Sequence, residues 1–300
     1  MKKIQLAALA LVASLSMSAE NTTKLRVWIG GEKKAEYTLT SVDSLTFYTP
    51  TTEEPLAGVF SVAVDKQVKF SKGNLQYTQS SDTWTFATQQ YDMLGYANEE
   101  NNALADKIDL FGWSGSTGTA KMGVSTSTEN SDYSGDFVEW GKNISDSGTW
   151  RTLTNDEWTY LSETRANAAN LMGLARINLD EAGTTYANGL ILLPDNWIDT
   201  EVTFKSGFPR DYSIQAYADY QTFTLKQWAT LEAAGAVFLP ASGQRYGASI
   251  YDIQQHAYYW SATLVKQYET AYYFWFNGAK ASTGPIGRMK GLLVRLVQDL

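Results

Sequence analysis

Alternating aromatic and polar residues mark the C-terminal part of the chain and predict β-strands there. The runs are YYWSATL (258–264), AYYFWFN (271–277) and GLLVRLV (291–297). In the first two, neighbouring side chains would point to opposite faces of a sheet. The third is apolar on both faces, which is typical of a strand covered on both sides. We expect these three strands to close the main domain.

Arg295 interrupts the apolar character of the third run. A guanidinium in a covered strand needs hydrogen-bond acceptors, because an unpaired buried charge is costly. We therefore expect a carboxylate or backbone carbonyls at its head group.

A capping box predicts one helix that begins after Thr154, because Glu157 stands three residues later. The helix should run to about Arg165. The spacing of Trp158 and Leu161 would place both side chains on its inner face.

A second capping box predicts another helix after Thr224, with Gln227 three residues later. Trp228 and Leu231 would supply its inner face. Gly235 is the expected C-terminal stop, because glycine readily adopts the left-handed conformation found there.

Short β-rich runs surround these helices. Strands are predicted at 59–64, 68–70, 74–77, 83–87, 188–193 and 236–239. The region 97–149 is rich in Asn, Ser, Gly and Thr, and we expect an irregular segment held by Phe111, Trp113 and Trp140. Two helices with many short strands predict an α+β domain.

The N-terminal part predicts separate units. The expected organisation is a signal peptide over 1–19, a small β module over 20–49, a linker over 50–57 and a main domain over 58–300. Within the module, 24–29 and 36–39 are predicted strands joined by a turn at Gly30-Gly31, and 41–47 is a third short element. The prolines, threonines and acids of the linker favour an extended conformation.

Export is the expected fate of the chain. Lys2 and Lys3 precede a short apolar run at 4–12, and Ser18 or Ala19 offers a cleavage site. The chain has no cysteine, so a lipid-modified cysteine after the leader is excluded. No later run is long and apolar enough to insert in a membrane. The expected location is the periplasm, the cell surface or the medium.

Composition narrows the function classes. The formal net charge is −8, and loss of a leader with two lysines and no acid makes it more negative by two. Such a chain is not expected to bind nucleic acid through phosphates. Zero cysteines and one histidine exclude thiol nucleophiles, cysteine-ligated metals and histidine clusters. We expect no cofactor and no metal of these kinds.

A set of strings carries a family resemblance. They are FSKGNLQY (70–77), IDLFGW (108–113), WRTLTNDEW (150–158), NGLILLPDNW (188–197), GAVFLPASGQR (235–245), YYWSAT (258–263) and GLLVRLV (291–297). Together they resemble the "Fibrobacter succinogenes major paralogous domain" group and related Bacteroidales surface proteins. That group resembles the C-type-lectin-like fold, in the branch shared with formylglycine-generating enzymes. The resemblance implies recognition at a surface, with ligand contacts in the loops between the C-terminal strands.

The chain departs from two activities of the wider fold group. The cysteine pair of formylglycine-generating enzymes is missing, so their oxidation chemistry is not implied. The Glu-Pro-Asn, Gln-Pro-Asp and Trp-Asn-Asp triplets of calcium-dependent lectins are also missing. Calcium-dependent sugar binding is therefore not implied, although a calcium site built from loop carboxylates stays open.

The polar connections between the C-terminal strands are the expected binding surface. The candidate contact residues are Arg245, Tyr246, Tyr251, His256, Gln267, Tyr268, Asn277 and, as an addition, Trp275. Exposed tyrosine and tryptophan rings can stack on sugars or pack against proteins at low entropic cost. The alternative is that these aromatic residues pack in the core, and it is the stronger one for Trp275.

Catalysis has little support in the sequence. No Gly-x-Ser-x-Gly elbow accompanies His256, which is expected to be a loop residue before a strand. A two-carboxylate glycoside hydrolase could use Asp106, Asp109, Asp136, Glu139, Asp195 or Asp211, but the sequence cannot bring two of them together. We expect an exported, non-catalytic recognition protein for a surface glycan or a partner protein. A secreted hydrolase and a structural component of a surface assembly are the alternatives, and the oligomeric state is open.

Overall fold

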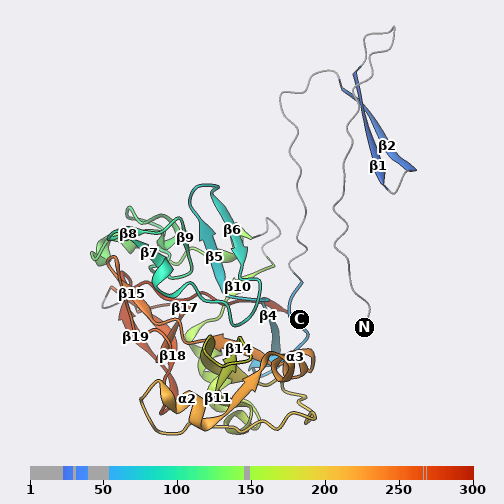
Figure 1. Ribbon diagram of the computed structural model, residues 1–300. Helices are drawn as coiled ribbons and strands as arrows, with labels where there is room; N and C mark the ends of the chain where they lie inside the picture. The colour runs from blue at the N-terminus through green and yellow to red at the C-terminus, as the bar shows by residue number, and fades with distance from the viewer. Residues whose placement is uncertain (1–22, 30–31, 40–53, 145–148, 266, 268) are drawn as a thin grey trace. The chain divides into compact units, whose positions relative to one another are not determined.

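The computed structural model of the protein describes residues 23–29, 32–39, 54–144, 149–265, 267 and 269–300 (Figure 1). The chain divides into two units between residues 52 and 53. Leu56, near the start of the second unit, donates its N–H to the Phe70 carbonyl at 2.8 Å and packs against the core. The end of the predicted linker is therefore attached to the domain that follows it.

The described part of the first unit is an antiparallel pair of strands, β1 (Thr23–Ile29) and β2 (Glu32–Leu39). Their register shifts by one residue between Val27 and Trp28, which marks a bulge. The two predicted strands are confirmed. The turn at 30–31, the element at 41–47 and the signal peptide at 1–19 lie outside the described residues.

The second unit is a mixed α+β domain built from small sheets, so the predicted class is confirmed at that level (Figure 1). The helices described are α1 (Asn155–Thr159), α2 (Gln215–Tyr220) and α3 (Leu225–Ala233). One four-stranded sheet has the order β10-β20-β4-β3, from β10 (Arg151–Thr152), β20 (Leu296–Asp299), β4 (Lys66–Phe70) and β3 (Phe60–Ala63). A second has the order β13-β11-β12-β14, from β13 (Thr222–Thr224), β11 (Met172–Asn178), β12 (Tyr186–Leu192) and β14 (Val237–Pro240).

Smaller sheets complete the domain. One has the order β6-β5-β9, from β6 (Thr83–Phe86), β5 (Leu75–Thr78) and β9 (Lys107–Ile108). Another has the order β17-β18-β19, from β17 (Ala257–Val265), β18 (Thr270–Phe276) and β19 (Ala281–Gly287). Two-stranded pairs join β7 (Glu99–Glu100) to β8 (Ala103–Leu104), and β15 (Gln244–Tyr246) to β16 (Ser249–Tyr251).

Both predicted capping boxes are present. At α1 the Glu157 N–H donates to Thr154 Oγ1 at 3.2 Å, and the Thr154 N–H donates to Glu157 Oε2 at 2.8 Å. The helix continues as a π-helical turn over Tyr160–Thr164. Trp158 and Leu161 are buried, as the spacing predicted. Each N-cap of this kind stabilises a helix by about 1 kcal/mol.

The box at α3 has the same form, with Thr224 and Gln227 in the two positions. Trp228 and Leu231 are buried on its inner face, and both belong to an apolar cluster between α3 and the sheet that contains β11 and β14. Gly235 ends the helix with φ of +100°, a conformation that disfavours other residues.

The predicted arrangement of the C-terminal strands is correct for the first two segments and wrong for the third. β17 pairs with β18, but the next partner of β18 is β19. The prediction of a polar connection over 277–288 missed this strand, whose sequence ASTGPIG has no apolar alternation. Its Pro285 is tolerated because β19 is at the sheet edge. Segment 291–297 instead makes isolated bridges and then enters β20, in a different sheet.

Arg295 is buried beside β20, and the prediction of a carboxylate or backbone carbonyls at its head group is confirmed by a carbonyl. Its guanidinium donates to the Lys72 carbonyl at 3.4 Å, to Gln90 Oε1 at 2.9 Å and to Asn74 Oδ1 at 3.4 Å. A backbone carbonyl is present as expected. Amide side chains take the place of the expected carboxylate among the described residues. Burial lowers the pKa of Arg295 to about 10.

The described part of the region 97–149, which is 97–144 and 149, is irregular apart from short 3-10 turns and two-residue strands, as predicted. Phe111, Trp113 and Trp140 are fully buried within it and belong to one apolar cluster with Trp260 of β17. The buried Arg288 donates to the carbonyls of Tyr133 and Gly135. Aromatic burial and arginine–carbonyl bonds therefore replace regular backbone pairing here.

A search of the described residues finds no helix with the length and apolar character that a membrane crossing needs.

Candidate functional site

The hairpin β15–β16 lies in the predicted binding loop and has two distinct faces. Tyr246 pairs with Ser249 across a two-residue connection, and Gly247 occupies its first position with φ of +61°. Glycine is favoured there because a type II′ turn needs a positive φ at that position. Cross-strand pairs share a face, so Gln244, Tyr246, Ser249 and Tyr251 point outward. Arg245 and Ile250 point inward.

Arg245 anchors the inner face, and its assignment as a ligand contact is wrong. The residue is 0% exposed, and its backbone pairs with Gly291 in both directions at 2.8 Å. Its guanidinium donates to the carbonyls of Ser125, Gly247 and Leu110 at 2.7, 2.8 and 3.2 Å. Burial lowers its pKa. The side chain is inside because a three-residue strand alternates its faces, so the two neighbours of an inward residue point out.

Tyr246 and Tyr251 form the aromatic part of the outer face. They are 39% and 49% exposed, so the prediction that both belong to an exposed surface is confirmed for this pair. Lys290 Nζ lies 3.9 Å from the centroid of the Tyr246 ring. This cation–π contact fixes one face of that ring and leaves the other face available.

A polar chain borders the tyrosines. The Tyr258 hydroxyl donates to Asp252 Oδ2 at 2.9 Å and lies 2.8 Å from His256 Nδ1. Because a carboxylate only accepts, the hydroxyl proton is directed at Asp252 and the ring nitrogen Nδ1 must donate. Burial, followed by the charge of Asp252, raises the pKa of Tyr258.

The loop that carries Asp252 and His256 is fixed to the sheet by Gln254. Its Oε1 accepts from the Asn188 N–H at 2.8 Å, and its Nε2 donates to the Tyr186 carbonyl at 3.0 Å. Asp252 and Gln254 have φ of +64° and +65°, which is unfavourable for residues other than glycine. The side-chain bonds hold this strained loop in place, so the polar chain has a fixed geometry.

Two further predicted contacts, Trp275 and Asn277, are less exposed than these tyrosines. Trp275 is half-buried and pairs with Tyr258 across β17 and β18. Asn277 is 6% exposed, and its Oδ1 accepts from the N–H groups of Ala279 and Lys280, so its assignment as a contact is wrong.

Gln267 is exposed but follows the far end of β17, whose nine residues span roughly 25 Å. It therefore belongs to a different part of the surface from the hairpin. Tyr268 lies outside the described residues.

We define the hairpin surface as the residues Gln244, Tyr246, Tyr251, Asp252, His256 and Lys290. Sequence reasoning found the tyrosines and the histidine but missed the other three. Gln244 Nε2 donates to Asp252 Oδ2 at 3.2 Å, so the two flank the same strand ends. The signal available was the alternation Gln-Arg-Tyr and the polar residue directly after Tyr251. Nothing in the sequence placed Lys290 against Tyr246.

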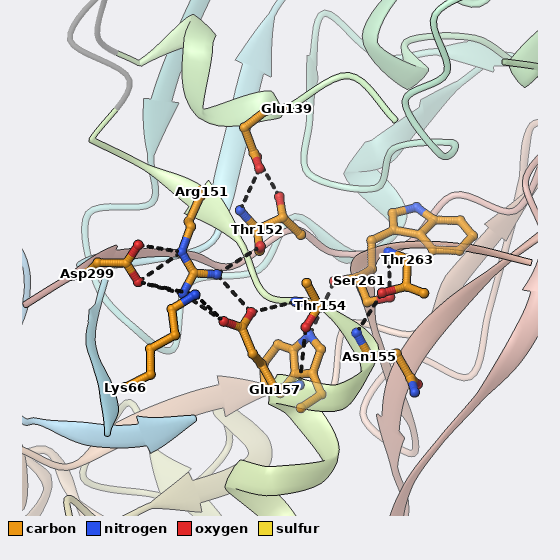
Figure 2. Close-up of polar contacts among 12 residues, drawn as sticks. Lys66, Glu139, Arg151, Thr152, Thr154, Asn155, Glu157, Ser261, Thr263 and Asp299 are labelled. Carbon is orange, nitrogen blue, oxygen red and sulfur yellow. Dashed lines mark hydrogen bonds and ion pairs between the residues drawn. The ribbon is translucent and has the colours of Figure 1, made fainter. Parts of the chain in front are cut away.

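The densest group of ion pairs is elsewhere and has a structural explanation. Figure 2 shows Arg151 and Lys66 converging on the carboxylates of Glu157 and Asp299, with contacts of 2.6–3.0 Å between Arg151 and the two carboxylates. Glu157 also closes the capping box of α1. The network therefore ties α1 to β10, β4 and β20. Every carboxylate in it is already hydrogen-bonded, which disfavours a role as a free acid or base.

The carboxylates considered for a hydrolase are mostly engaged too. Asp106 accepts from Ser80, Glu139 from Thr152 (Figure 2), Asp195 from Arg165, Asp211 from Ser213, and Asp109 from the Leu94 N–H. Asp109 is fully buried, and this burial raises its pKa to about 6. Within the described ranges, no three His, Cys, Asp or Glu side chains cluster as a metal site would require.

Comparison with known proteins gives no further assignment. No family model, no curated protein and no solved structure matches the chain.

Proposed function

We propose that this chain is an exported, non-catalytic recognition protein whose main domain has the C-type-lectin-like fold and binds a glycan. The contact area is the hairpin surface. The resemblance of its sequence strings to exported surface proteins supports the fold and the export. The observation that carries the binding role is the pair Tyr246 and Tyr251, exposed together on a hairpin whose inner side is locked by Arg245.

A rigid support under exposed aromatic rings favours binding. Tyrosine offers a large apolar face with little side-chain entropy to lose. The three carbonyl bonds of Arg245 and the buried Ile250 fix the hairpin before any ligand arrives. Preorganisation of this kind reduces the entropic cost of association.

The groups around the tyrosines favour a glycan over a protein partner. A sugar ring needs an apolar platform together with donors and acceptors for its hydroxyls. Asp252 accepts, Lys290 donates, and Gln244 Nε2, which already donates one N–H to Asp252, has a second N–H to donate. These groups lie at the margin of two rings, an area suited to one or two sugar units. A protein partner is the alternative outcome of the test below.

Glycan-array binding should test this role. Tyr251→Ala and Tyr246→Ala should each weaken binding by about tenfold or more, because truncating an aromatic anchor typically costs ~2 kcal/mol. Their thermal midpoints should stay near that of the parent, since both side chains are exposed. Ile198→Ala removes another exposed apolar side chain, 80% exposed, and serves as the matched control with unchanged binding.

Trp260→Ala should behave in the opposite way. Trp260 is 1% exposed and donates to the Phe111 carbonyl at 2.7 Å, so its loss should destabilise the domain by about 3–5 kcal/mol. Tyrosine variants that bind normally but unfold much more easily would show that these rings support the fold, and the proposed surface would be abandoned. Release of a chromophore from a panel of glycosides would instead favour a hydrolase.

A further inference from the structure

A cavity of about 400 Å³, lined by none of the residues of the hairpin surface, lies between three segments of the domain. One wall comes from β5 and β9, another from the segment 88–94, and the third from the β11–β12 hairpin. Its lining consists of Gln76, Thr88, Tyr91, Asp92, Met93, Leu94, Lys107, Leu179, Thr185, Tyr186 and Ala187. Pockets of this volume hold small molecules in other proteins.

Gln76 gives the cavity a polar group without a protein partner. The residue is 4% exposed and lies on β5, where Leu75 and Tyr77 point to the opposite, apolar side. Among the described residues, no hydrogen bond joins its side-chain amide to another group. The amide atoms are not among the fully buried polar atoms without a partner, so they face the cavity and can bond to a ligand or to solvent there.

The walls around this amide are apolar and aromatic. Met93, Leu94 and Leu179 are half-buried, and Tyr91, Met93 and Leu179 pack against the cluster beneath α3. The Arg176 guanidinium carbon lies 3.8 Å from the centroid of the Tyr186 ring, and Arg176 is itself held by Asn188 Oδ1 at 2.9 Å. This stacked pair fixes the orientation of the Tyr186 ring.

The charged groups are at the edge of the cavity. Lys107 is exposed, and Asp92 already accepts from the Gln89 N–H at 2.8 Å. Neither offers a desolvated ion pair to the centre of the cavity, where the polar group is the neutral amide of Gln76. A ligand that matches this arrangement is neutral, has adjacent donors and acceptors, and has an apolar face for an aromatic ring.

From this arrangement we infer a second binding site, one that takes a neutral hexose-sized sugar with adjacent hydroxyls paired to the Gln76 amide. A primary amide can donate to one hydroxyl and accept from its neighbour. Tyr91 and Tyr186 supply aromatic faces for the ring carbons. The site uses no residue of the hairpin surface, so a test of one site does not decide the other.

The test is titration of the full chain with free D-glucose, D-galactose and D-mannose, followed by saturation-transfer NMR and calorimetry. At least one hexose should bind with a Kd on the order of 1 mM, as expected for about twelve heavy atoms. Gln76→Met keeps the side-chain volume and removes the amide. It should weaken that binding by about tenfold or more, because two hydrogen bonds are lost.

Stability separates a ligand-binding amide from a structural one. Since Gln76 has no protein partner, Gln76→Met should leave the thermal midpoint unchanged or raise it. Gln215→Met, a matched change on the exposed side of α2, should alter neither readout. The inference is overturned if no hexose binds, if Gln76→Met binds as tightly as the parent, or if Gln76→Met destabilises the domain. Binding of zwitterionic leucine or glycine in place of hexoses would also overturn it.

Discussion

Arg245 and Arg151 are each held by several hydrogen bonds, but their partners differ in charge. Beneath the hairpin, Arg245 is fully buried and donates only to the carbonyls of Ser125, Gly247 and Leu110. At the junction of α1 with β10, Arg151 is half-buried between the carboxylates of Glu157 and Asp299 (Figure 2).

The comparison teaches that a guanidinium can serve two different purposes in one domain. At Arg245 it collects backbone carbonyls from segments far apart in sequence and so replaces a regular sheet. Neutral partners make this contribution insensitive to pH and salt. At Arg151 it joins elements through charges, and the contribution depends on the ionisation of Glu157 and Asp299. Substitutions in the two regions should therefore lower the free energy of unfolding by different amounts, and the loss should depend on pH only at the Arg151 network.

Arg245→Met should lower the free energy of unfolding more than any substitution in the Arg151 network. It leaves three buried carbonyls without donors, and each such loss costs about 1–3 kcal/mol. We expect a decrease of about 3–5 kcal/mol in the free energy of unfolding, equal at pH 5 and pH 8, measured by urea denaturation. Arg210→Met removes an exposed arginine and serves as the control, since it should change the free energy of unfolding little. A loss below 1 kcal/mol would mean that solvent satisfies the carbonyls and that Arg245 does not anchor the hairpin.

Glu157→Gln should have an intermediate effect that depends on pH. Glutamine keeps the capping box, as Gln227 does at α3, and removes only the charge opposite Arg151. We expect a loss of about 1–2 kcal/mol at pH 7 in the free energy of unfolding. The capping box of α3, formed by Thr224 and Gln227, is the internal reference for this substitution.

The sign of the pH dependence follows from the pKa of Glu157. Burial acts to raise this pKa, but the bonds from Arg151, Lys66 and the Thr154 N–H outweigh it, and the net pKa is lowered. A lowered pKa stabilises the folded state above the unfolded value of about 4.3, and that contribution is lost as pH falls through the folded value. The parent and Glu157→Gln should therefore converge below about pH 4. If the free energies of unfolding of the parent and Glu157→Gln differ by the same amount down to pH 2, ionisation of Glu157 does not cause the pH dependence.

Lys66→Met should have the smallest effect. Lys66 Nζ lies 2.8 Å from Glu157 Oε1, but its side chain is 44% exposed. Solvent screens such a pair, so we expect a loss of about 0.5 kcal/mol or less, decreasing further in 1 M salt. A loss comparable to that of Glu157→Gln would indicate that the lysine, not Arg151, is the main partner of Glu157.

Local features of this fold could be predicted because their causes lie within a few residues. The capping boxes at Thr154 and Thr224 each depend on a residue three positions away, and both are present. Strands such as β3, β5 and β6 followed from short apolar runs. β19 could not be predicted in this way, because pairing to β18 makes it a strand despite its one proline and two glycines.

The candidate sites show the same limit. Tyr246 and Tyr251 could be placed in a polar loop, but the alternation Gln-Arg-Tyr of β15 is too short to have shown from the sequence that Arg245 points inward. The sequence did not single out Gln76, because its amide faces a cavity that forms only where β5, the segment 88–94 and the β11–β12 hairpin come together. Such sites depend on contacts between segments that are distant in the sequence.

The position of β20 has a consequence for how quickly the domain folds. β20 lies between β4 and β10, and Arg295 just before it bonds to Asn74, 221 residues earlier in the chain. Closing so long a loop costs chain entropy before any contact compensates for it. We therefore expect refolding over seconds, with β3 and β4 paired early and the second edge of β4 open. An unpaired strand edge invites association, so the refolding yield should fall as protein concentration rises.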